Sequence, residues 1–114
     1  MKAKENKLTE DDLKRIEKIV NRLDNLISRE NKKLKNRGFV WQTYIRPFLQ
    51  EFTEDLKEII HHEVPNIEKR FEKIVHDFRN WFVNQSKSGK HVWERYKDVI
   101  NRYIEDLEEI LDDC

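Results

Sequence analysis

The chain has little of what sheets, tight turns and disulfide frameworks require. Its 114 residues include two glycines, two prolines and one cysteine. An all-β fold needs more turn residues than this, so the composition argues against one. Cys114 is the last residue and has no second cysteine in the chain to pair with. We therefore expect a reducing compartment, and a link between two chains only under oxidising conditions.

Net charge and long apolar runs are also missing. Lysine and arginine total 23 and aspartate and glutamate total 23, so the formal net charge is zero. Such a balance disfavours nucleic acid and anionic membranes as partners. No apolar run approaches the roughly 18 residues that span a bilayer, and residues 1–7 lack the apolar centre of a signal peptide. We expect a soluble protein of the cytoplasm, or a recombinant soluble protein, without either segment.

What the sequence does contain is apolar residues at spacings of three and four, which predict amphipathic helices. A chain of this length forms one domain, 1–114, in which we expect residues 1–8 to be frayed. The fold class is all-α, an antiparallel up-down-up-down four-helix bundle. We predict helices at roughly 10–36, 39–62 with a kink near Pro47, 65–84, and 89–112.

The helix ends carry recognisable signals. Thr9 is a good N-cap, and Gly38 can take the left-handed conformation that ends a helix. The polar run 84–89 predicts the last loop. Nine of the twelve aromatic residues lie between Phe39 and Phe82, and their spacing predicts a core rather than a ligand cavity. In the second helix this core stripe comprises Trp41, Ile45, Phe48, Phe52, Leu56 and Ile59, and tyrosines and tryptophans are expected at the core margin.

Two prolines leave alternatives open. Pro47 removes a backbone hydrogen bond, so it either kinks one helix or opens a new helix after a short first one; the unbroken apolar spacing favours the kink. The apolar phase also continues across Pro65, which is compatible with a single bent helix or with two helices. We predict a tight turn there, because one helix of over forty residues would leave too little partner surface to cover it.

Charge is distributed unevenly along the chain. Residues 1–37 hold 12 basic and 7 acidic residues, whereas residues 94–114 hold 3 basic and 8 acidic residues. In the predicted topology the first and last helices are antiparallel neighbours, so the two imbalances meet and favour this arrangement. The basic group is Lys7, Lys14, Arg15 and Lys18, and the acidic group is Glu105, Asp106, Glu108, Glu109, Asp112 and Asp113.

Few residues are arranged for chemistry. Glu58 and His61 have the Glu-x-x-His spacing of di-iron bundles, but no second pair exists and Glu58 falls outside the apolar stripe. His61, His62 and Glu63 could form at most a weak surface metal site, and a solvated turn is the simpler interpretation. No serine or cysteine has an activating neighbour. We expect no catalytic residue, no bound metal, no cofactor and no enzymatic activity.

The strongest candidate site is a basic patch. The connections after the first and third helices share one end of the predicted bundle, where a phosphate, an acidic peptide or a nucleic-acid backbone could bind. The ordinary interpretation is that these side chains complement helix C-termini. The speculative anion-binding patch comprises Lys32, Lys33, Lys35, Arg37, Lys87 and Lys90.

We therefore expect a non-enzymatic helical bundle, a structural scaffold or a protein-interaction module, existing as a monomer or weak homo-oligomer. The alternative is a small bundle that binds an anionic partner, nucleic acid or an acidic peptide, through its basic end. A designed or redesigned bundle without an evolved function is a further interpretation. The lack of a distinctive motif is consistent with design, whereas the single alanine, the tryptophans and the asparagines differ from idealised helix sequences. A natural backbone with a redesigned interior fits both observations.

Overall fold

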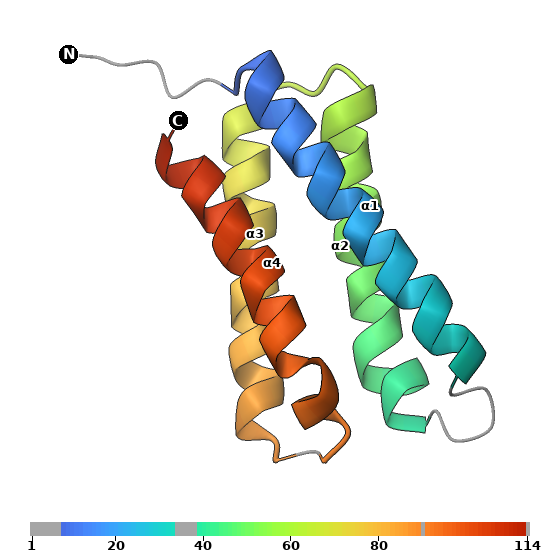
Figure 1. Ribbon diagram of the computed structural model, residues 1–114. Helices are drawn as coiled ribbons and strands as arrows, with labels where there is room; N and C mark the ends of the chain where they lie inside the picture. The colour runs from blue at the N-terminus through green and yellow to red at the C-terminus, as the bar shows by residue number, and fades with distance from the viewer. Residues whose placement is uncertain (1–7, 34–38, 90, 114) are drawn as a thin grey trace.

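The computed structural model describes residues 8–33, 39–89 and 91–113, and it confirms the all-α prediction. Four α-helices account for nearly all of these residues, and no strand occurs among them (Figure 1). A short π-helical turn, η1, directly precedes the second α-helix. The elements are α1 (Glu10–Lys33), η1 (Trp41–Ile45), α2 (Arg46–His61), α3 (Ile67–Lys87) and α4 (Trp93–Asp113).

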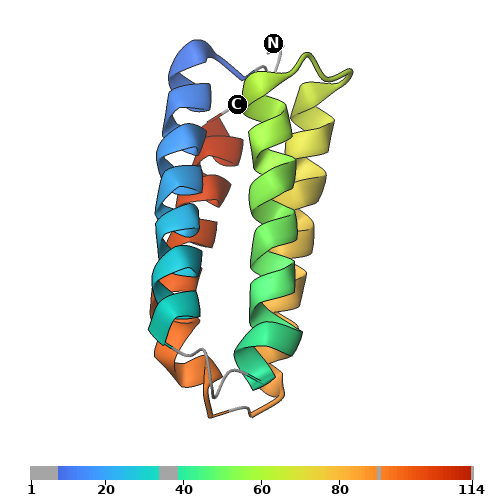
Figure 2. The ribbon, with the colours of Figure 1, turned by 90° about the vertical axis from the view of Figure 1, so that its right-hand side faces the viewer.

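Successive helices alternate in direction, so both described ends of the chain lie at one end of the bundle (Figure 1). The turned view shows α1 beside α2, with α4 behind α1 and α3 behind α2 (Figure 2). Helix α1 packs on α2 and α4, and α3 packs on the same two helices. The molecule measures 52 × 27 × 19 Å, and its two shorter dimensions are each about two helix diameters. Within the described ranges, no helix combines the length and apolar character needed to cross a membrane.

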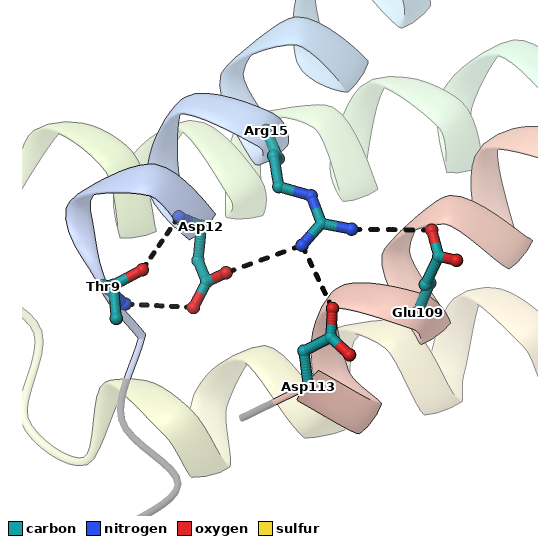
Figure 3. Close-up of polar contacts among 5 residues, drawn as sticks. All are labelled: Thr9, Asp12, Arg15, Glu109 and Asp113. Carbon is teal, nitrogen blue, oxygen red and sulfur yellow. Dashed lines mark hydrogen bonds and ion pairs between the residues drawn. The ribbon is translucent and has the colours of Figure 1, made fainter.

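Helix α1 begins with the predicted cap. The Asp12 N–H donates to Thr9 Oγ1 and the Thr9 N–H donates to Asp12 Oδ2, both at 3.1 Å, a reciprocal capping arrangement (Figure 3). Arg15, one turn later, reaches Glu109 at 3.5 Å and Asp113 at 3.3 Å on α4. The predicted contact between basic and acidic ends is thus present through Arg15. Lys7 lies outside the described residues.

The π-turn η1 corrects the prediction for the second helix. Its bonds run five residues back, as from the Arg46 N–H to the Trp41 carbonyl, so one turn holds an extra residue. Helical backbone runs unbroken from η1 into α2, as in the kink alternative, but Pro47 lies in the first turn of α2, as in the alternative in which a new helix opens there. Leu49 is fully buried, whereas Phe48 is 38% exposed. The prediction that Phe48 belongs to the core stripe is therefore wrong, because the buried row of α2 runs through Leu49, Phe52, Leu56 and Ile59 and leaves Phe48 at its edge.

The turn at Pro65 is confirmed. Helix α2 ends at His61 and α3 begins at Ile67, two residues later than predicted. Asn66 precedes α3 with φ of 52°, in the left-handed region that asparagine tolerates better than most residues. The reversal is therefore achieved by Pro65 and Asn66 together, which places α3 antiparallel to α2.

The last connection lies later in the chain than predicted. Helix α3 continues to Lys87, so residues 84–87 of the predicted loop are helical, and α4 starts at Trp93 rather than near Gly89. Gly89 has φ of 73° and supplies the left-handed residue of the turn. The Trp93 indole N–H donates to Ser86 Oγ at 3.0 Å. This bond across the connection explains why the polar residues at the end of α3 remain helical.

The core is aromatic, and some of its largest members lie deeper than predicted. Trp41, Trp93 and Tyr96 are almost fully buried rather than marginal. Their polar atoms are satisfied internally: Trp41 Nε1 donates to Asn31 Oδ1 at 2.7 Å, and Tyr96 Oη donates to Glu30 Oε1 at 2.8 Å. Burial of aromatic rings is therefore compatible here with the rule that buried polar groups find partners.

Candidate functional site

The predicted anion-binding patch is described only in part. Helices α1 and α3 do end at the same end of the bundle (Figure 1), and the side chains of Lys32 and Lys87 are exposed there. Lys35, Arg37 and Lys90 lie outside the described residues, and only the backbone of Lys33 is described. Lys32 and Lys87 both lie in the last turn of a helix, where the helix dipole favours a cation.

The residues weighed for metal chemistry are solvent-facing. Glu58 is exposed and pairs with Arg70 at 2.7 Å, as expected for a residue off the apolar stripe. His61, His62 and Glu63 are exposed at the end of α2 and the following turn. Across the described parts of the chain, no three histidine, cysteine, aspartate or glutamate residues are grouped so that they could hold a metal ion.

A different surface lies where α2 begins and α3 ends, and aromatic rings are exposed there. Phe39 is 71% exposed, Phe48 38% and Tyr44 36%. Two ring pairs are in contact here. Phe39 meets Tyr44 edge to face with ring centroids 6.1 Å apart, and Phe48 stacks on Trp81 with ring centroids 5.8 Å apart. We call Phe39, Tyr44, Phe48 and Trp81 the aromatic face. It lies over η1, the first turn of α2 and the last turns of α3.

Both α2 and α3 place this face. Within α2 the buried row runs through Leu49, Phe52 and Leu56, so Phe48 lies at the edge of α2 next to Trp81 of α3. The Trp81 indole N–H donates to the backbone carbonyl of Tyr44 at 3.3 Å, so a carbonyl of η1 accepts a hydrogen bond from a side chain of α3. The aromatic face is thus held from both helices.

A groove continues from the aromatic face along the seam between α2 and α3. It has a volume of about 460 Å³, and Phe48, Phe52 and Trp81 form its apolar end. Its other lining residues are polar or acidic: Glu51, Asp55, Asp77, Asn84 and Gln85. We call this the α2–α3 groove. It is therefore a surface with an aromatic end and an acidic end.

The acidic end is electrostatically unfavourable in the free protein. Burial, followed by the charge of Glu51, raises the pKa of Asp55 above its usual value; Arg70 opposes this, and Glu58 and Asp77 add to it. Asp77 pairs with Lys73 at 2.9 Å. Neither Glu51 nor Asp55 forms an ion pair with another described residue. Of the three carboxylates in the groove, only that of Asp77 is thus paired with a cation among the described residues.

One buried acceptor also lines this groove. The Gln85 Oε1 atom is inaccessible to solvent and has no hydrogen-bond partner among the residues that the structure describes. A buried acceptor without a partner is unfavourable by roughly 1–3 kcal/mol. The groove therefore has acceptors, both charged and neutral, in excess of donors.

A second groove, between α1 and α2, differs because its charged side chains are already paired. Lys57 in its lining already pairs with Asp24 at 3.1 Å and with Glu54 at 3.5 Å. Its charges are matched within the protein, and the exposed large rings lie elsewhere. The α2–α3 groove is therefore the stronger candidate.

Periodicity could not locate the aromatic face, because rows of three-and-four spacing pass through either Phe48 or Leu49. The sequence signal that bears on it is Pro47, whose missing N–H marks a possible break in the α-helical bonding. Even so, Pro47 indicates an irregularity and not which neighbouring ring turns outward. The acidic residues were visible, but their position beside Trp81 depends on the pairing of α2 with α3.

Comparison with known proteins adds no relative: no protein-family model, curated protein or solved structure matches the chain. What the surface does must therefore be inferred from its own residues. Exposed rings in contact with one another are typical of binding surfaces, whereas single exposed apolar residues are ordinary. The contacts from Phe39 through Trp81 place this surface in the first group.

Proposed function

We propose that the chain is a non-enzymatic helical bundle that binds a partner protein through the aromatic face. The observation that carries the proposal is the exposure of Phe39, Tyr44 and Phe48 around the start of α2, where Phe39 contacts Tyr44 and Phe48 stacks on Trp81. Tyrosine, tryptophan and phenylalanine are enriched in the cores of protein interfaces and supply much of their binding energy. Such rings on a free surface are unfavourable until a partner covers them.

The underlying structure supports a preformed site. Trp81 is nearly buried, and it contacts Phe48, Phe52, Phe78 and Trp93 as well as the Tyr44 carbonyl. A partner that docks on these rings would therefore meet a rigid surface and would lose little affinity to reordering.

A variant pair tests the proposal. Phe48→Ser removes an exposed ring from the aromatic face, and Val83→Ser removes an equally exposed side chain, 38% in each case, outside the α2–α3 groove. The probes are helical peptides that share one apolar anchor and differ in charge, titrated while the Trp81 indole signal is followed by NMR. Trp81→Phe assigns that signal.

We expect at least one peptide to shift the Trp81 signal, and Phe48→Ser to weaken its binding at least tenfold while Val83→Ser leaves it unchanged. Light scattering on the same samples detects self-association through the face. Absence of peptide binding in every charge class, together with monomeric behaviour at millimolar concentration, would overturn the proposal.

The basic end is the alternative. Binding of an oligonucleotide there should weaken steeply with salt and should be abolished by reversing the charges of Lys35, Arg37, Lys87 and Lys90. The protein-binding proposal is favoured because the carboxylates that line the groove beside the exposed rings would repel a polyanion.

A further inference from the structure

The α2–α3 groove changes in character along its length, and this order constrains the partner. Phe48 and Trp81 form one end, and Asp55 and Asp77 lie further along α2 and α3. From Phe48 to Asp55 is seven residues of α2, or about 10 Å at 1.5 Å per residue. An apolar contact and a charged contact about two helical turns apart are therefore available to one ligand.

We propose that the partner is a basic amphipathic segment of another protein, which lays an apolar side chain on the aromatic face and an arginine side chain among the carboxylates of the groove. This inference rests on the proposed function, and it adds the chemistry of the partner.

Charge complementarity carries the argument. Glu51 and Asp55 lack cationic partners among the described residues, and the raised pKa of Asp55 reflects burial and neighbouring negative charge. A cation placed between them would relieve this repulsion. Neutral and acidic segments would not relieve it.

Phe48 and Trp81 do not form an aromatic cage that could hold a lone ammonium group. Phe48 and Trp81 are stacked at 5.8 Å with an angle of 26° between their planes, so the two rings cover each other and leave no slot between them. A cation must therefore pair with the carboxylates or lie on the outer side of Phe48. Arginine suits both positions, since its planar guanidinium pairs with carboxylates and stacks on rings. Arg79 behaves in this way nearby, pairing with Glu108 while it lies over the Phe82 ring at 5.4 Å.

A second copy of the chain fits this groove less well. The exposed face of α1 is basic, with Lys14, Lys18 and Arg22, and so offers the required charge. However, the exposed large apolar side chains of the described residues are Phe39, Tyr44, Phe48 and Val83, none of which is on α1. Docking of α1 would therefore provide charge without an apolar anchor. Self-association remains a distinct outcome of the experiment below.

The experiment compares three helical peptides with the same apolar anchor and, seven positions away on the same face, two arginines, two glutamines or two glutamates. A fourth peptide carries the arginines on the opposite face. Titrations into the full chain follow the Trp81 indole signal. We expect the arginine peptide to bind at least tenfold more tightly than the glutamine peptide at low salt, and this advantage should shrink as salt rises.

Protein variants identify the site. The double variant Glu51→Gln/Asp55→Asn should lose the preference for arginine but retain weak binding through the rings. Its control is Glu72→Gln/Glu94→Gln, which removes two exposed carboxylates outside the groove. Because the first variant removes repulsion, it should melt at the same or a higher temperature than the parent chain. Weaker binding then cannot be attributed to unfolding.

Four outcomes contradict the inference in distinguishable ways. Equal or tighter binding of the glutamine or glutamate peptide overturns the basic partner and leaves the proposed function standing. An arginine preference that survives Glu51→Gln/Asp55→Asn, or tight binding of the opposite-face peptide, shows that the arginine does not bind among the carboxylates of the groove. Self-association blocked by Phe48→Ser, without peptide binding, replaces the foreign segment by a second copy. Absence of all binding overturns both proposals.

Discussion

The hydrogen bond from Tyr96 to Glu30 provides the sharpest test of how the core is stabilised. Tyr96 lies on α4 and Glu30 on α1, and both are buried. The phenol donates to the Glu30 carboxylate at 2.8 Å, and Glu30 also lies 4.0 Å from Arg29 Nε. Tyr96→Phe keeps the ring and its packing against Trp41 but removes the donor, so a buried carboxylate loses one partner.

The expected loss is about 2 kcal/mol of unfolding free energy, since hydrogen bonds to charged groups contribute roughly 1.5–3 kcal/mol. Unfolding entropy near 60 °C is about 2.1 cal/mol/K per residue, or roughly 0.24 kcal/mol/K for 114 residues. The midpoint of thermal unfolding should therefore fall by about 8 °C. Circular dichroism melts and urea titrations at pH 7 measure both quantities.

Tyr103→Phe is the matched control. Tyr103 lies on the same helix, is also buried, and its hydroxyl makes no hydrogen bond to another described residue. Its replacement should change the unfolding free energy by less than about 0.5 kcal/mol. If both variants lose the same stability, the bond to Glu30 contributes nothing specific and the reasoning is refuted.

Alkaline pH gives an independent measurement of the same bond. Burial, and then the hydrogen bond to Glu30, raises the pKa of Tyr96 above its usual value of 10.0. Above that pH the unfolded chain releases this proton while the folded chain keeps it, so the stabilisation present below pH 10 is lost as pH rises. The gap between the parent chain and Tyr96→Phe should shrink by about 1.4 kcal/mol per pH unit above 10.

Three further predictions concern the pairing of Arg79 with Glu108, the backbone conformation of Asn66 and the π-turn. Arg79→Lys loses the two-pronged pairing with Glu108 at 2.7 and 3.0 Å and should reduce the unfolding free energy by about 1 kcal/mol in urea titrations. Asn66→Gly should be neutral, whereas Asn66→Val should lower stability by at least about 1 kcal/mol, because φ of 52° is strained for a β-branched residue. Deleting Thr43 removes the extra residue of η1; the Trp81 indole N–H should then lose its backbone acceptor, which its NMR shift would report.

Sequence reasoning predicted the helices because their signals are local. The apolar row from Leu13 to Ile27 and the Thr9 cap define α1 without reference to the rest of the chain. Turn formation at Pro65 required one further argument, that a single long helix would lack partners. Gly38, predicted to end the first helix, lies outside the described residues.

The errors occur where a residue's environment is decided by another element. Phe48 and Leu49 are adjacent and both apolar, and rows of three-and-four spacing pass through either; the structure buries Leu49. Residues 84–87 read as loop because they are polar, but Ser86 accepts from the Trp93 indole across the turn. Neither the burial of Leu49 nor the bond between Ser86 and Trp93 could be inferred from the local composition, since each depends on other parts of the chain.

Two unfavourable features of the free protein therefore coincide in space. Exposed rings at the start of α2 would be better buried, and the carboxylates of Glu51 and Asp55 would be better separated or paired. A bundle optimised only for stability has simple remedies for both, such as a polar residue at Phe48 and a lysine at Asp55. Each remedy alters one position, and neither disturbs the core. One basic amphipathic ligand would relieve both features at once, and this is why the α2–α3 groove, rather than the basic end, is where a partner should be sought.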